Sequence, residues 1–228
     1  IIINEDWGRL LGYIIGDGHL SAKNHMGISC STDYPDIIED VKRLYQAMSL
    51  HPFEVKKKSG HVNVLVITKG VDVKATSNHL LAFLRYLNIE SRSYMNTKNL
   101  CIPDIIWRSP RSVMREFLCG LFETDGTVSA GGSRLSFTTK CYRLAHDVQF
   151  ALLAFGIAGK LVAKWNKQYA KNYYTVMLCR EFCDIFAKEL GFISAKKSAE
   201  LAALIKKPHS NRYKPFDYLN PLALRMAA

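Results

Sequence analysis

The sequence has no run of about 18 consecutive apolar residues, which is the length that a membrane-spanning helix needs. The apolar residues 1–3 are also far too few for the hydrophobic core of a secretory signal. These absences exclude a transmembrane helix and a signal peptide within this chain, and no membrane partner is expected.

Paired cysteine motifs are absent too. The chain has six cysteines and seven histidines, but it contains no CxxC, and the closest cysteine pair is Cys179 with Cys183. The histidines show no spacing typical of metal ligands. A disulfide scaffold and a zinc ribbon are therefore excluded, and reduced thiols in an intracellular protein are predicted.

The composition is that of a folded protein with a basic surplus. Of the 228 residues, 48% are hydrophobic, 22% are charged and 11% are aromatic, which leaves room for one large core or two smaller ones. Lys and Arg number 31 against 20 Asp and Glu, giving a net charge of +11. Of the basic residues, 18 follow position 110. Such a charge favours a polyanionic partner, most often nucleic acid.

An internal repeat links the two halves of the chain. Residues 10–18 read LLGYIIGDG and residues 118–126 read LCGLFETDG, so that Asp17 and Asp125 end two matching segments. The elements expected after each segment also match. In order, they are a strand (26–31 and 134–139), a helix (36–48 and 144–155), a hairpin (53–57 with 62–68, and 160–165 with 173–179) and a helix (78–87 and 182–190).

Small residues lie on one face of each motif segment. Gly12 and Gly16 are four positions apart, and Gly120 and Thr124 repeat that spacing. Residues with this spacing share a helix face, so two such helices can pack with their backbones close together. Asn4 is expected to cap the first motif helix, and Ser109 followed by Pro110 to start the second.

The ends of the two helices then coincide. Gly18 and Gly126 suit helix C-termini, where a positive φ is often required, and the packing brings Asp17 and Asp125 together. Two carboxylates at the negative ends of helix dipoles repel one another. A divalent cation removes that repulsion, and oxygen ligands favour Mg²⁺ over Zn²⁺. Paired carboxylates with metal ions near a phosphate are a known arrangement for phosphodiester hydrolysis.

This pair of motifs resembles the LAGLIDADG homing endonucleases in their single-chain form with two motif copies. The stretches CIPDIIWRSPRSVMREFLCGLFETDG (101–126) and RLSFTTKCYRLAHDVQFALLAFGI (134–157) resemble members embedded in inteins. Ile15 and Glu123 stand where the family name has its first Asp, but both terminal acids are kept. The chain has neither Cys or Ser at position 1 nor a C-terminal His-Asn, so it is not expected to be competent for protein splicing, and only an endonuclease portion is expected.

The resemblance implies an α+β fold of two pseudo-symmetric αββαββα halves. The motif helices would form the interface, and the curved antiparallel sheets would form a saddle for double-stranded DNA. The expected division is 1–108 for the first half, 109–205 for the second and 206–228 for a C-terminal arm. Because one chain holds both motifs, a monomer is expected.

The resemblance also implies the chemistry. Asp17 with the carbonyl of Gly16, and Asp125 with the carbonyl of Thr124, would bind Mg²⁺ at the scissile phosphates, and Mn²⁺ or Ca²⁺ could substitute in binding. The expected product is a double-strand break with short 3′ overhangs at a long pseudo-palindromic site. The family places a basic residue near each active site, which implicates Lys98 in the first half and Lys196 or Lys197 in the second.

Strand alternation indicates which side chains would face DNA. In each half, polar residues alternate with apolar residues that would face the core. A two-stranded ribbon fits the major groove, where polar side chains read bases and basic ones contact phosphates. The residues predicted to bind DNA are Ser29, Ser31, Lys56, Lys58, Lys69, Arg134, Ser136, Thr138, Lys140, Lys160, Lys164 and Asn166.

Two other functions are compatible with the same fold. One is an RNA maturase that assists intron splicing, and the other is a DNA-binding regulator that does not cleave. The retained Asp17 and Asp125 favour the endonuclease over the regulator. The host element is an intron or an intein, and the intein-like stretches favour the intein.

Overall fold

The computed structural model describes residues 3–20, 25–56, 70–89, 100–129, 134–168 and 170–206. Within these residues the first half follows the predicted order of helix, two strands, helix, two strands and helix. Its elements are α1 (Glu5–Asp17), β1 (Gly18–Leu20), β2 (His25–Ser31), α2 (Pro35–Ala47), β3 (Phe53–Lys56), β4 (Gly70–Thr76) and α3 (Asn78–Tyr86).

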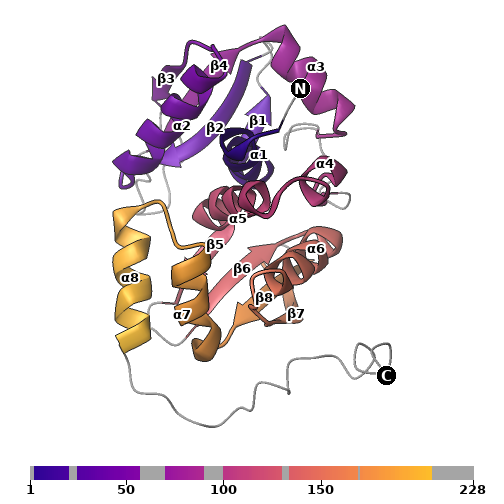
Figure 1. The fold of residues 1–228 in the computed structure, drawn as a ribbon, viewed down its shortest axis with the longest axis vertical. Helices are drawn as coiled ribbons and strands as arrows, with labels where there is room; N and C mark the ends of the chain where they lie inside the picture. Colours follow the sequence, from indigo (N-terminus) through magenta and orange to yellow (C-terminus); the bar gives the residue numbers. More distant parts are fainter. Residues whose placement is uncertain are drawn as a thin grey trace.

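The second half repeats this order after a short helix, α4 (Asp104–Trp107), and adds a further helix at the end. Its elements are α5 (Arg111–Asp125), β5 (Gly126–Val128), β6 (Leu135–Thr139), α6 (Tyr142–Leu153), β7 (Gly159–Asn166), β8 (Lys171–Leu178), α7 (Arg180–Glu189) and α8 (Ala195–Lys206). Figure 1 shows α1 and α5 side by side in the middle of the molecule, with one half above them and the other below.

The two sheets have the same topology, which confirms the repeat and the α+β fold. Their strand orders are β1-β2-β4-β3 and β5-β6-β8-β7, and all the neighbouring strands pair antiparallel. One hydrophobic core runs through both halves and includes Tyr13 of α1 and Phe117 of α5, both fully buried. The motif helices therefore lie inside one continuous core, and the two halves do not meet merely at their surfaces.

Local sequence explains how several helices begin. The Asn4 side chain accepts a hydrogen bond from the Trp7 amide at 3.0 Å, as predicted, and Ser77 caps α3 in the same way through the Leu80 amide. Ser109 does not cap α5, because its hydroxyl donates to the Ile105 carbonyl at 2.7 Å and Pro110 takes the cap position. That prediction was wrong, since the end of α4 already engages Ser109.

The first hairpin also differs from the prediction. The partner of β3 is β4, with Phe53 opposite Lys74 and Lys56 opposite Val71, and not residues 62–68. Residues 62–68 lie outside the described part of the chain. The sequence at β4 alternates Val71, Asp72, Val73, Lys74 and Ala75, and the three apolar residues are buried while Lys74 is partly exposed. The helices α4 and α8 were not predicted either, and the domain boundary at 108/109 stays a prediction.

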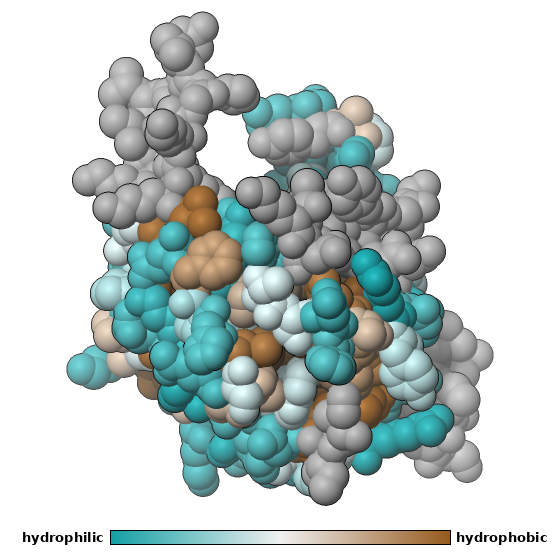
Figure 2. Space-filling view, turned by 90° about the horizontal axis from the view of Figure 1, so that it is seen from above, coloured by the Kyte–Doolittle hydropathy of each residue, from teal (hydrophilic) through white to brown (hydrophobic). Residues whose placement is uncertain are grey.

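Figure 2 shows hydrophilic residues over most of the described surface in that view, with hydrophobic ones in separate small areas. In the described ranges no helix is both long and apolar enough to span a membrane. All six cysteines are free thiols, as the sequence predicted.

Candidate active site

The two motif helices touch through their glycines. A Cβ added to Gly12 would meet the Phe117 carbonyl oxygen and lie 2.9 Å from the Leu121 amide, and one added to Gly120 would lie 2.5 Å from the Arg9 carbonyl oxygen. Gly16 faces the Thr124 side chain in the same way. The predicted close approach of α1 and α5 is confirmed, and larger residues at these positions would force the helices apart.

Glycine is needed after each motif helix, but not for the positive φ that was predicted there. Gly18 has φ −71° and Gly126 has φ −82°, so neither adopts the left-handed conformation. The amide of Gly18 donates to the Ile14 carbonyl and that of Gly126 to the Phe122 carbonyl, and a Cβ at either position would collide with the same carbonyl oxygen. Glycine is thus required by close contact as the chain leaves the helix and enters β1 or β5.

Asp17 and Asp125 are the last residues of α1 and α5, and both are partly exposed. The residues just before them, Gly16 and Thr124, lie against each other across the helix pair. Both carboxylates are also close enough to act electrostatically on Lys197. The structure therefore brings the two predicted acids to one junction. Beside it lies a cavity of about 430 Å³ whose lining includes Asp17, Thr124, Lys197, Ser29, Ser31 and Tyr34.

Lys197 is the lysine at this junction. Its Nζ donates to the Glu123 carbonyl, to the Gly126 carbonyl at 2.9 Å and to the Phe122 carbonyl at 3.5 Å, so the ammonium caps the C-terminal end of α5. Its side chain is only 12% exposed. Burial lowers the pKa of Lys197, while the negative charges of Glu123, Asp17 and Asp125 act in the opposite direction.

The other two candidate lysines are placed differently. Lys196 is exposed, and its Nζ lies over the Tyr34 ring at 5.0 Å from the centroid. Lys98 lies outside the described residues. Of the two candidates in the second half, Lys197 is thus the one that the fold directs to the motif aspartates.

Glu123 is a polar residue of the site whose role the sequence did not indicate. Its carboxylate is buried, with Oε2 accepting from the amides of Ile193 at 2.9 Å and Ser194 at 3.2 Å. Oε1 accepts from the Ser194 hydroxyl at 2.6 Å and lies 3.9 Å from Lys197 Nζ. Glu123 thereby fixes the turn that begins α8. The only sequence signal was its place within the motif, where the family name has Asp.

The second sheet presents a polar row on its open face. Leu135 and Phe137 are fully buried whereas Ser136 and Thr138 are partly exposed, so the predicted alternation is confirmed. Directly paired strand residues share a face. Ser136 is opposite Met177, and Met177 is also opposite Lys160, which places Lys160 on the open face with Ser136. Lys164 and Asn166 lie on the same face, because they follow Lys160 at even spacings along β7. Arg134 contacts Met177 on this face, and Lys140 lies over the ring of Tyr173.

The first sheet has an open face with a different chemistry. Ser29 donates its hydroxyl to Asp72 Oδ1 at 3.0 Å. The Nε2 atom of His19 lies 3.3 Å from Asp72 Oδ2, and the Nζ atom of Lys74 lies 3.8 Å from it. Ser31 is partly exposed on the same strand face as Ser29. Lys74 of this face was missed because the strand that carries it was expected eight positions too early in the chain.

The facing predicted for β3 was wrong. Glu54, expected on the same side as Lys56 and Lys58, pairs with Lys42 of α2 at 2.6 Å, so this side of β3 is covered by a helix. The backbone of Lys56 pairs with that of Val71, and its side chain lies outside the described part of the structure. The error arises because Phe53 and Val55, the apolar residues expected to face the core, are themselves exposed. Lys58 and Lys69 lie outside the described residues, and DNA contact by any of these side chains stays a prediction.

The donor set at the junction fits a hard divalent cation. The two aspartates and the carbonyls of Gly16 and Thr124 offer only oxygen, and Mg²⁺ commonly takes one or two protein carboxylates and retains several waters. In the described ranges, His, Cys, Asp and Glu side chains form no group of three or more that could hold a metal. A cation here would depend on the two aspartates, the carbonyls and water.

Comparison with known proteins supports the resemblance seen in the motifs. Residues 112–191 match the family described as the LAGLIDADG-like domain. The glutamine–fructose-6-phosphate aminotransferase (isomerizing) of Methanocaldococcus jannaschii is 23% identical over 203 residues, which is 87% of this chain and 17% of that protein. The replication factor C small subunit of the same organism is 27% identical over 209 residues, 91% of this chain and 10% of that protein. The chain therefore spans a small part of the curated relatives it matches.

Two solved structures share the fold over most of this chain. I-DmoI in complex with DNA and Mn superposes with a TM-score of 0.57 at 13% identity, covering 83% of this chain and 98% of that one. Full-length DUF199/WhiA from Thermatoga maritima gives a TM-score of 0.55 at 14% identity, covering 98% of this chain and 68% of that one. At these identities the likeness establishes the LAGLIDADG fold of this chain, with two motif copies in one polypeptide.

Proposed function

We propose that this chain is a site-specific endonuclease for double-stranded DNA of the homing endonuclease type. One observation carries the proposal: the motif helices are in backbone contact and end at Asp17 and Asp125, with Lys197 beside both carboxylates. The two carboxylates could hold a metal cation at the junction, which the open faces of the two sheets flank. Such an arrangement is suited to hydrolysis of a phosphodiester held across the junction.

A divalent cation is part of the proposal. Asp17 and Asp125, with the carbonyls of Gly16 and Thr124, would hold Mg²⁺, and Mn²⁺ or Ca²⁺ would substitute in binding. The metal would supply activation of the attacking water and stabilisation of the leaving oxygen. The carboxylates stand at helix C-termini, where the dipole disfavours negative charge, so the bound cation would also stabilise the ends of α1 and α5. The presence of Mn with DNA in the I-DmoI structure supports this choice.

DNA would lie over the open faces of the two sheets. Lys160 and Lys164 are exposed on β7, and Arg134 and Lys140 flank β6 on the same face. These cations are suited to phosphates, while Ser136, Thr138 and Asn166 offer groups that can read base edges. The target would be long and pseudo-palindromic, because the two sheets repeat one topology. Cleavage of both strands by one monomer would leave short 3′ overhangs.

The host element is proposed to be an intein. The match covers 87% of this chain but only 17% of an aminotransferase, and 91% of this chain but only 10% of a replication factor subunit. A segment shared by two proteins with unrelated names is readily explained as an inserted module. We further propose an intracellular location, consistent with six free thiols.

A DNA-binding regulator that does not cleave is the second candidate. The fold is shared over 98% of this chain with DUF199/WhiA, a protein whose description names no endonuclease. The fold by itself therefore does not decide whether this chain cleaves DNA. A regulator would bind DNA without depending on the two aspartates. An RNA maturase on the same fold is the third alternative and is separated from the others by its substrate.

The test is a cleavage assay on DNA that joins the host sequences without the insertion. Wild type, Asp17→Asn and Asp125→Asn are incubated with this DNA and Mg²⁺, and a parallel reaction contains EDTA. The expected result is one defined double-strand cut by the wild type, lost in both variants and without metal, while DNA binding persists. Binding without any cut by the wild type would favour the regulator. Tight binding to a structured intron RNA in place of DNA would favour the maturase.

A further inference from the structure

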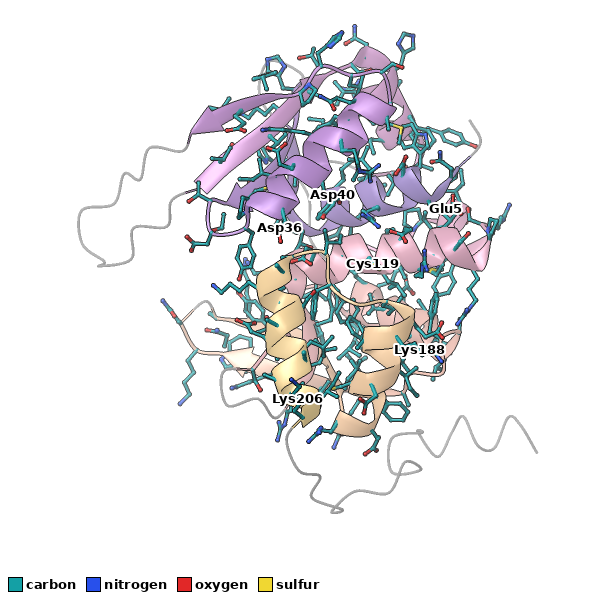
Figure 3. The ribbon with its side chains drawn as sticks, turned by 60° about the vertical axis from the view of Figure 1, so that its left-hand side comes forward. Glu5, Asp36, Asp40, Cys119, Lys188 and Lys206 are labelled. Carbon is teal, nitrogen blue, oxygen red and sulfur yellow. The ribbon has the colours of Figure 1, made fainter. Side chains whose placement is uncertain are left out.

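The start of α8 is held by carboxylates from both halves of the molecule. The first amides of a helix lack partners within the helix and must find them elsewhere. Here the Ala195 amide donates to Asp36 Oδ2 of α2, in the first half, at 2.6 Å. Glu123, in the second half, accepts from the amides of Ile193 and Ser194. Figure 3 shows Asp36 facing the beginning of α8 from the opposite half.

A second contact strengthens this connection. Lys196, the residue after Ala195, places its ammonium over the ring of Tyr34, directly before α2. Ser194 is completely buried and donates its hydroxyl to Glu123. The first turn of α8 therefore rests on the first turn of α2, and its orientation depends on how the two halves sit against each other.

Lys197 lies in that same first turn. From there its ammonium reaches the carbonyls of Glu123 and Gly126 at the end of α5. A lysine side chain is long and flexible, so its placement at a site depends on where its backbone is fixed. Asp36 is the carboxylate through which the first half accepts a hydrogen bond from the Ala195 amide of this turn.

We propose that Asp36 is a positioning residue for the cleavage reaction. By capping α8 from the other half, it holds Lys197 against the end of α5 beside Asp17 and Asp125. The proposal rests on the proposed function for its effect on cleavage, but the positioning itself can be measured without any cleavage. It also makes the placement of a second-half lysine depend on the first half.

The first measurement is the chemical reactivity of Lys197. The full chain and its Asp36→Ala variant are treated with a limiting amount of acetic anhydride, and acetylation of Lys197 is quantified by mass spectrometry against Lys188 in the same sample. Loss of the cap should expose Lys197 and raise its relative acetylation at least threefold. Glu39→Ala is the matched control, because it removes a carboxylate from the exposed side of the same helix, where Glu39 pairs with Lys42.

The second measurement is a double-mutant cycle on cleavage. Single-turnover rates with Mg²⁺ are compared for wild type, Asp36→Ala, Lys197→Met and the double variant. If Asp36 acts through Lys197, Asp36→Ala should slow cleavage about tenfold in the wild-type background and change it less than twofold in the Lys197→Met background. Its affinity for DNA should stay within threefold of the wild type, whereas a purely structural role would slow both backgrounds equally.

The outcomes separate this proposal from the function on which it rests. Unchanged acetylation of Lys197 in Asp36→Ala, or an equal loss of rate in both backgrounds, would overturn the positioning role. Increased acetylation in a protein that cuts no DNA would keep the positioning role and reject the endonuclease. If Asp36→Ala does not fold, Ala195→Pro is measured in its place, because proline is tolerated at the first helical position and lacks the amide that donates to Asp36, and the same changes are expected in the same direction.

Discussion

Arg9 of α1 and Glu116 of α5 form an ion pair across the helix interface, with Nε 2.7 Å from Oε2. The same guanidinium reaches Asp40 of α2 through Nη1 at 3.2 Å, and Tyr13 donates its hydroxyl to that carboxylate at 3.0 Å. Burial and the charge of Asp40 raise the pKa of the Tyr13 phenol, which keeps the donating proton in place. Arg9 thus bridges two largely buried carboxylates from different halves, and each also pairs with a more exposed arginine, Asp40 with Arg43 and Glu116 with Arg115.

Replacing Arg9 should therefore destabilise the fold strongly. In Arg9→Met the carboxylates of Asp40 and Glu116 lose their shared cation, and the free energy of unfolding at pH 7 should fall by about 3 kcal/mol. Urea denaturation measures this change. Arg115→Met is the control, because Arg115 also pairs with Glu116 but is 48% exposed and should matter by less than about 1 kcal/mol. Equal losses in the two variants would contradict this assignment.

Gly16→Ala should strain the contact between the motif helices. The added methyl group would overlap the Thr124 side chain, and overpacking of this kind costs about 1–3 kcal/mol. Thermal unfolding measures the loss. Since the clash involves both Cβ and Oγ1 of Thr124, adding Thr124→Gly should restore most of the stability lost in Gly16→Ala. A double variant less stable than Gly16→Ala would show that the clash is not the cause.

Lys197→Met should separate catalysis from DNA binding. The variant loses the cation beside Asp17 and Asp125, so single-turnover cleavage should slow about 100-fold. Affinity for DNA should change less than threefold, because Lys197 is largely buried and not on an open sheet face. The control for a lost positive charge is Lys188→Met, because Lys188 is an exposed lysine on α7. A rate equal to that of the control would remove Lys197 from the candidate site.

The buried thiols should resist modification in the native protein. Burial raises the pKa of Cys119 to about 12 and that of Cys183 to about 11, so almost no thiolate forms at pH 8. We expect iodoacetamide at that pH to label the partly exposed Cys101 and Cys179 first. Peptide mass spectrometry in the absence and presence of denaturant measures the order. Labelling of Cys119 at the rate of Cys179 in native protein would show that the region around α5 opens readily.

The sequence was sufficient for those parts of the fold that depend on local pattern and repetition. The motif copies ending at Asp17 and Asp125 identified two halves, and the glycine spacing predicted that the helices pack through their backbones. The alternation at Ser136 and Thr138 gave the correct open face of the second sheet. These features are set by residues near one another in the chain, and a repeat provides each of them twice.

The failures share a different cause. The partner of β3 lies at Gly70–Thr76 and not at 62–68, because a longer connection separates these strands than a tight hairpin requires. Strand pairing depends on contacts between distant residues. The facing of Glu54 was reversed for another reason, because the apolar Phe53 and Val55 are exposed on the open side of β3. Likewise, the site role of Glu123 depends on the turn at Ile193 and Ser194, some 70 positions away. Such contacts leave no signal within either segment.

The backbone contact between α1 and α5 bears on how the proposed endonuclease could be redesigned. At Gly12 and Gly120 the helices meet through carbonyl and amide groups, so their separation is set by the peptide chain and not by interchangeable side chains. The residues proposed to read DNA stand on the strands, away from that contact. Substitutions on the strands could therefore alter the preferred target while the stagger between the two cuts stays fixed. Recognition and cutting would be separate engineering problems in this scaffold.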